Sequence, residues 1–481
     1  MLFRSRQGAY ANLSNDFIVF ISPVVFISTG GEQTDLQSKI NRFREIGSRY
    51  GPANVPGVKS QFSPRYLVYD SREKVSKVLR DLAAADLGIS VVVTGLRDQV
   101  TECCRDARLS PHTVNQSLGF WGKTEKLPDF RILEITTMCG HGRISPNLVW
   151  ELARQVQQHL LDAKEAARKM GQLCLCNIFN EPRAARLLRE LVADLEVGTL
   201  SKPQPNYSRE IAVQKDFGIT IDQAKCIQCL NCLPYCPVEA IVESPDSKTV
   251  SIDADRCTEC GLCRQAVACP VDAIVARDLT WPRSLRGKFQ SQYAPYRSAP
   301  ILGPTPEPVR YSEEIHIFRR HELPSEHTND VNGLLGHGEG LVVVELGRPH
   351  LSTTFRDVQS VIQALVPIGL QLRLQYPLHD ERSSLAELAT DAANGILRQE
   401  IMAERASWVC LKMVVQEDVV PEVVRSLRQV ATEIDTVFAL GIVSRVSDDG
   451  STVADRVAGR TGVKPAPHCK TNVGLGRPPR R

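Results

Sequence analysis

The sequence lacks the short motifs that most often identify a nucleotide-binding or catalytic site. It contains no G-x-G-x-x-G opening a strand–helix–strand unit, no G-x-x-x-x-G-K-[ST] and no H-E-x-x-H. The usual nicotinamide or flavin, phosphate-loop and zinc-protease sites are therefore not indicated. No stretch reaches the roughly 18 apolar residues of a transmembrane helix. The formal net charge is only +3, so nucleic acid is not an expected partner.

Cysteine, by contrast, is abundant. The chain has 15 cysteines in 481 residues, an odd number, and many of them are separated by only two or three residues. This clustering argues against an extracellular disulfide framework. Closely spaced thiolates that hold metal need a reducing compartment, so we expect a cytoplasmic protein.

Two cysteine motifs follow one another in the middle of the chain. The first has the spacing C-x2-C-x2-C-x3-C before a proline: Cys226, Cys229, Cys232, Cys236, Pro237. The second repeats it with a longer last gap: Cys257, Cys260, Cys263, Cys269, Pro270. Ile221-Asp222 recurs as Ile252-Asp253, and residues 237–241 recur, with one conservative change, at 270–274. These matches indicate an internal duplication.

The duplicated motifs resemble the bacterial two-cluster 4Fe–4S ferredoxin family over about residues 218–280. In that family the fourth thiolate of each cubane comes from the other motif. The resemblance implies one cluster on Cys226, Cys229, Cys232 and Cys269, and a second on Cys257, Cys260, Cys263 and Cys236. Five residues separate Cys263 from Cys269 where the simple pattern has three, so we expect Cys269 to approach its cluster differently. Zinc, the alternative, does not account for the repeat with its Cys-Pro ends.

Residues 1–63 show no clear periodicity. Phe17–Ser28 is an apolar run behind Arg4 and Arg6, which superficially resembles a signal peptide, but it contains Pro23 and is too short to span a bilayer. We expect a poorly ordered N-terminal extension, or a start codon placed too far upstream.

Residues 64–198 alternate between strand and helix patterns, which predicts a small α/β domain. The expected strands are Tyr66–Tyr69, Ile89–Thr94 and Ile132–Thr137. Helices are expected after the capping residues Ser71, Ser145 and Asn180, and around Val100–Ala107, where Cys103 and Cys104 lie on the apolar face. Asn115–Leu127 is interpreted as a covering loop.

The whole chain is predicted to be an α+β multidomain protein. Beyond the cysteine motifs, residues 281–338 are predicted to be a proline-rich linker. Residues 339–447 show the order β-α-β-β-α-β of the ferredoxin-like backbone fold, similar in topology to ACT-like domains, and are a possible homodimer contact. The basic, Gly- and Pro-rich residues 448–481 are predicted to be a disordered tail.

A second candidate site combines Cys139, His141, Cys174 and Cys176. Cys139 and His141 lie in a loop expected between a strand and a helix, where ligands bind in open α/β sheets. Three thiolates and one imidazole suit zinc or an unusual cubane, and Asn177, Asn180 and Arg183 are candidates to hold a carboxylate or phosphate. The alternative is that these cysteines are buried as small apolar residues.

Three functions are compatible with these patterns. The first is an electron-transfer protein that passes low-potential electrons to a fused or partner redox site, as part of an oxidoreductase. The second is a ferredoxin-fused reductase with its own active site in residues 64–198. The third is a non-catalytic redox or ligand sensor.

Overall fold

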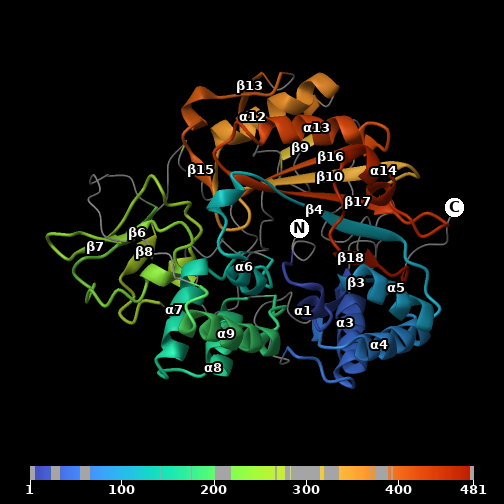
Figure 1. Ribbon diagram of the computed structural model, residues 1–481, viewed down its shortest axis with the longest axis horizontal. Coiled ribbons are helices and arrows are strands. Elements are labelled where there is room, and N and C mark those ends of the chain that lie inside the picture. Colours follow the sequence, from blue (N-terminus) through green and yellow to red (C-terminus); the bar gives the residue numbers. More distant parts are fainter. Residues whose placement is uncertain are drawn as a thin grey trace.

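The computed structural model describes residues 6–22, 33–54, 65–140, 142–174, 176–200, 218–265, 268–276, 282, 315–318, 335–369, 371–373, 388–391 and 394–476. Its largest feature is a ten-stranded sheet in the order β12-β9-β16-β10-β17-β4-β18-β3-β1-β2 (Figure 1). The strands come from both ends of the chain: β1 Phe17–Ser22, β2 Tyr66–Tyr69, β3 Ser90–Leu96, β4 Thr113–Gly122, β9 Ile315–Phe318, β10 Glu339–Leu346, β12 Gln371–Arg373, β16 Val409–Gln416, β17 Val437–Arg445 and β18 His468–Asn472.

Strands β1–β3 are covered by helices on both faces. Phe17, Val19 and Ile21 pack against α3 Gln33–Ser48, α4 Arg72–Ala85 and α5 Arg97–Asp106. Ile18 and Phe20 face the other layer, which comprises α6 Phe130–Thr136, α7 Pro146–Gln157, α8 Ala163–Leu173 and α9 Glu181–Glu196. A strand buried on both faces is a continuous apolar run. The prediction of a poorly ordered extension over 1–63 is therefore wrong for residues 6–22 and 33–54, which also include α1 Tyr10–Leu13.

The predicted helix starts are confirmed, whereas one predicted strand is wrong. The side chains of Ser71, Ser145 and Asn180 cap α4, α7 and α9. Ile132–Thr137, predicted as a strand, instead lies in and just after α6, whose N-cap is Asp129. Residues 132–136 are all buried, including the polar Glu134 and Thr136, so the sequence of this short helix shows no helical period of apolar residues.

The other half of the sheet contains the predicted β-α-β-β-α-β order, in β10, α12 Phe355–Leu365, β12, β16, α13 Val420–Val430 and β17. Its apolar core packs against α12, α13 and α14 Val453–Thr461. These strands continue through β4 into β18 and β3. Residues 64–198 and 339–447 therefore contribute to one sheet rather than to two.

Three further predictions differ from the structure. Residues 113–122 form strand β4 rather than a covering loop. Strand β9 comes from the predicted linker 281–338 and lies between β12 and β16. The predicted disordered tail 448–481 is wrong over residues 448–476, because α14 is capped by Thr452 and β18 inserts between β3 and β4.

Residues 218–276 form a small module on one side of the molecule, next to α7 (Figure 1). It contains two two-stranded ribbons and two short helices: β5 Ile219–Ile221 with β8 Ile274–Ala276, β6 Ile241–Glu243 with β7 Val250–Ile252, η3 Leu233–Tyr235 and α10 Leu262–Gln265. The remaining short elements are β11 Thr353–Thr354 with β15 Arg405–Ala406, β13 Ala389–Asp391 with β14 Ile396–Leu397, η2 Thr124–Lys126, η4 Val366–Ile368 and η6 Gln399–Ile401. None of the described helices combines the length and apolar composition that crossing a bilayer requires.

Candidate metal centre and adjacent pocket

The small module is built from two matching halves. Left-handed backbone recurs at positions 31 or 33 residues apart, the same offsets as the sequence repeat: Gln228 and Glu259, Leu230 and Gly261, Glu239 and Asp272. Alternating left- and right-handed residues turn successive amide groups toward one side and favour an anionic group there. The duplication is therefore one of backbone conformation as well as of sequence.

One cavity of this module, cavity 1, is lined by Cys226, Cys229, Cys232 and Cys269. The amide of Ala273 donates a hydrogen bond to Cys269 Sγ at 3.1 Å. Burial raises the pKa of Cys232 to about 12, and the thiols of Cys229, Cys226 and Cys269 add to that rise. Cys229 is exposed, so cavity 1 lies close to solvent.

The second cavity, cavity 2, is lined by Cys236, Cys257, Cys260 and Cys263. The amide of Ala240 donates to Cys236 Sγ at 3.1 Å, which repeats the Ala273–Cys269 contact of the other half. Burial raises the pKa of Cys263 well above 9, and the neighbouring thiols that add to the rise include Cys232 of cavity 1. The two cavities are therefore adjacent, and each collects three thiols from one motif and one from the other.

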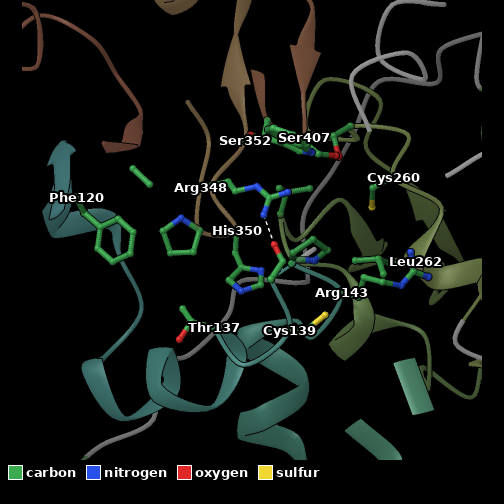
Figure 2. Close-up of a pocket in the computed structure, with 18 residues that line it drawn as sticks. Phe120, Thr137, Cys139, Arg143, Cys260, Leu262, Arg348, His350, Ser352 and Ser407 are labelled. Atoms are coloured by element: carbon green, nitrogen blue, oxygen red, sulfur yellow. Dashed lines mark hydrogen bonds between the residues drawn. The ribbon is translucent and has the colours of Figure 1, made fainter. Parts of the chain in front are cut away.

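A larger pocket, the central pocket, lies where the module meets the rest of the protein (Figure 2). Its volume is about 70 Å³, against about 20 Å³ for each cysteine cavity. It is lined by three groups of residues: Pro237, Val238, Thr258, Cys260 and Leu262 from the module; Phe120, Thr137, Cys139, Gly140, Gly142 and Arg143; and Arg348, Pro349, His350, Ser352, Ser407, Trp408 and Ala439. Cys260 thus belongs to both cavity 2 and the central pocket.

Two hydrogen bonds tie the module to the rest of the protein. Ser407 Oγ donates to Thr258 Oγ1 at 3.0 Å. Asn147 Nδ2, on α7, donates to the carbonyl of Cys236 at 3.3 Å. Cavity 2 is therefore held against the pocket by contacts from both the helical layer and the sheet.

Two buried arginines and one histidine line the pocket. The Arg348 guanidinium lies over the Trp408 ring, 4.2 Å from its centroid, and donates to the carbonyl of Gly140. Figure 2 shows His350 next to Arg348 in the middle of the pocket. Burial, with the charge of Arg348, lowers the pKa of His350 to about 3, so its imidazole is neutral at pH 7. Arg143 donates from Nε to the carbonyl of Leu173 at 2.9 Å.

The comparisons with known proteins agree with the geometry of the module. A family model described as a 4Fe-4S dicluster domain matches residues 218–279. The pyruvate synthase subunit PorD of Methanothermobacter marburgensis is 36% identical over 76 residues, which is 16% of this chain and 85% of that protein. The subunit of the same name from Methanocaldococcus jannaschii is 30% identical over 73 residues, 15% of this chain and 81% of that protein.

The chain belongs to the 4Fe–4S dicluster domain family. This confirms the family predicted for residues 218–280, here called the ferredoxin module, and identifies it as an iron–sulfur electron-transport domain. No solved structure matches the chain.

The second predicted site is partly assembled. Cys139, Cys174 and Cys176 are all buried. A hydrogen bond with Cys174, then burial, raise the pKa of the Cys139 thiol well above 9, and Cys174 also contacts Cys176. His141 lies outside the described residues. Within the described part of the chain, no group of three or more His, Cys, Asp or Glu side chains is arranged around a single metal ion, whereas a cubane takes one thiolate at each of its four iron corners. The additional metal site therefore stays a prediction.

Two residues proposed from the sequence to bind a carboxylate or phosphate have a different role. Arg183 pairs with the buried carboxylate of Asp16 at 2.9 Å, and Asn180 caps α9 and donates to Asp16 Oδ1 at 3.1 Å. Two other residues of the pocket, Arg348 and His350, lie in the turn after β10 and were not predicted from the sequence. The signal was weak: a Gly-Arg-Pro-His run directly after a buried strand.

Proposed function

We propose that the ferredoxin module holds two 4Fe–4S clusters, one in each cysteine cavity, with the crossed ligand sets implied by the family resemblance. A cubane has four iron corners, and each cavity offers four thiols. The loop before Cys269 is longer than the simple pattern, yet Cys269 receives the same 3.1 Å amide contact as Cys236. This equivalence supports similar placement of the two closing thiols.

We further propose that the protein is an iron–sulfur electron-transfer protein whose module serves a redox site in the central pocket of the same chain. When bound, the clusters supply one-electron transfer. The observation that carries this proposal is the shared wall: Cys260 lines both cavity 2 and the central pocket. At the other end, the exposed Cys229 gives an external donor access to cavity 1.

A second candidate function is that of an electron-transfer subunit in a larger oxidoreductase. The similarity to two proteins named pyruvate synthase subunit PorD favours it, because most of each relative is covered by the match. In that case the partner protein would contain the redox site that the module serves. The sensor hypothesis and the homodimer contact through 339–447 remain predictions.

The first test is anaerobic purification of the full chain with iron and acid-labile sulfide analysis. We expect about eight of each per chain. Cys229→Ser and Cys260→Ser should each lose about four irons. Cys103→Ala, which removes a buried thiol on α5 outside the module, should lose none. Protein that contains zinc but no iron would contradict the proposal.

The second test addresses the route. In stopped-flow mixing with a reduced low-potential ferredoxin as protein donor, the cluster that Cys229→Ser retains should be reduced more slowly than in the wild type. Equal rates would show that electrons do not enter at cavity 1. Turnover of a substrate by the isolated chain would favour the fused redox site, whereas activity only with a co-purified partner would favour the subunit.

A further inference from the structure

We propose that Cys139 and Cys174 are a redox-active pair, which closes to a disulfide and is reduced to two thiols by the ferredoxin module. Cys139 lies in the loop after α6, whereas Cys174 is the C-cap of α8. Their thiols nevertheless share a hydrogen bond. Close approach of the two sulfur atoms is the first requirement for a disulfide. This proposal rests on the proposed function, because the clusters supply the electrons.

The backbone around both sulfur atoms suits a change of charge on sulfur. The backbone of Arg143 makes a hydrogen bond with the Cys139 thiol, and the backbone of Ile178 makes one with the Cys174 thiol. Each partner lies four residues after its cysteine, as in the two amide contacts of the ferredoxin module. A disulfide that has received one electron is negatively charged, and hydrogen bonds to a charged group favour it.

The burial of the pair indicates what can reduce it. Cys139 is 2% exposed and Cys174 is 0% exposed. Thiol–disulfide exchange requires a thiolate to attack one of the two sulfur atoms directly, and burial prevents an external thiol from reaching them. Electron transfer needs no such contact. A redox centre inside the same chain is therefore the appropriate reductant.

The cluster of cavity 2 is placed to be that reductant. Cys139 and Cys260 line the same central pocket (Figure 2). Burial raises the pKa of Cys260, and the hydrogen bond with Cys174 is the main cause of the raised pKa of Cys139. The positive charge of Arg143 opposes both rises, so Arg143 lies near both thiols. An electron leaving the cluster would cross only the pocket wall.

The step balances in atoms and electrons. The disulfide takes up two electrons and two protons, its S–S bond breaks, and two thiols form. Each 4Fe–4S cluster transfers one electron at a time, so the two clusters together supply the pair. A reduced low-potential ferredoxin is the external donor, and the protons come from water. The reverse step returns both electrons to the clusters. The pair of cysteines would thus store two electrons beside the central pocket.

The first experiment is a disulfide map of the full chain, purified anaerobically and oxidised with thionine. Free thiols are alkylated in acid before digestion with trypsin. We expect a disulfide between the peptides 132–143 and 170–183, and none after reduction with dithionite. Cys176→Ser should keep this link, whereas Cys174→Ser should lose it. Wild-type protein without the link, or with a disulfide inside 170–183 alone, would overturn the proposal. The wild-type result does not depend on whether a variant folds.

The second experiment counts electrons in an anaerobic titration of the oxidised protein with dithionite. The wild type should take up about four electrons, two in the clusters and two in the disulfide. Cys139→Ser should take up about two and keep about eight irons. Cys103→Ala, which removes a buried thiol on α5, should behave like the wild type. Loss of iron from Cys139→Ser would show that Cys139 is a cluster ligand, which would overturn the proposal.

A third measurement separates this proposal from the proposed function. With reduced ferredoxin as donor, Cys260→Ser should reduce the disulfide at least about tenfold more slowly than the wild type, because it lacks the cluster of cavity 2. Equal rates would overturn reduction by the module. Protein without iron would refute the proposed function, while the disulfide map would still decide whether the two cysteines pair.

Discussion

Replacing Asp16 with asparagine should destabilise the protein by at least about 2 kcal/mol. Asp16 is fully buried and pairs with Arg6 and, at 2.9 Å, with Arg183. Burial alone would raise the pKa of Asp16, but the charges of Arg6 and Arg183 outweigh burial and lower it from 3.8 to about 2. A pKa difference of about 2 corresponds to roughly 2–3 kcal/mol. Leaving two buried guanidinium groups without their carboxylate brings the expected loss to roughly 2–5 kcal/mol.

The stabilisation by Asp16 should depend on pH in a specific way, which provides a further test. Because the folded pKa of Asp16 lies below the unfolded one, its contribution is fully present above about pH 4 and is lost as the pH falls through about 2. Urea unfolding of iron-loaded protein, followed anaerobically by circular dichroism, should therefore show a constant difference between wild type and Asp16→Asn from pH 7 to about pH 4. Asp435→Asn, which breaks a surface pair with Lys126, should change stability little. An Asp16→Asn variant as stable as the wild type would refute the argument.

Three further predictions concern the sheet and the central pocket. Burial lowers the pKa of His468 from 6.5 to about 3, so its contribution to the stability of the fold decreases as the pH falls below 6.5. The urea midpoint of the His468→Leu variant should therefore change less between pH 6.5 and pH 4 than the midpoint of the wild type. A Cβ added at Gly347, where φ is +84°, would lie 2.8 Å from the carbonyl carbon of Ser352, so Gly347→Ala should lose more than about 1 kcal/mol in urea unfolding. Ser407→Ala removes the hydrogen bond to Thr258, which should cost about 1 kcal/mol and speed proteolytic cleavage of the ferredoxin module.

Local signals in the sequence identified much of the fold. The cysteine spacing was sufficient to identify the family of the ferredoxin module. Cap residues such as Ser71 and Ser145 marked real helix starts, because capping depends on neighbours within three or four positions. The capping box of α12, formed by Thr354 and Asp357, is also an interaction between near neighbours in the sequence. These features need no information from distant parts of the chain.

The missed strands depend on distant partners. β1 is an apolar run whose two faces are covered by different helical layers, so it shows no alternation. Strand β18 is even more difficult to predict from the sequence, because His468–Asn472 is largely polar yet completely buried. Its interpretation as a disordered tail followed from composition, whereas its position is determined by pairing with β3 and β4.

The central pocket could not be assembled from the sequence for the same reason. Arg143, Cys260 and Arg348 are more than 80 residues apart along the chain, and only the packing of the module against the sheet and the helices brings them together. Cys139 does contact Cys174, whereas the predicted second site itself stays a prediction. It did not identify the residues after β10 that complete the wall.

The crossed ligand sets are tested most directly by electron paramagnetic resonance of the reduced Cys269→Ser variant, compared with Cys229→Ser and Cys260→Ser. If the closing thiol of cavity 1 comes from the second motif, Cys269→Ser will lose the same signal as Cys229→Ser and keep the signal that Cys260→Ser loses. If Cys269→Ser instead loses the signal that depends on Cys260, each motif holds its own cluster and the proposed arrangement is wrong.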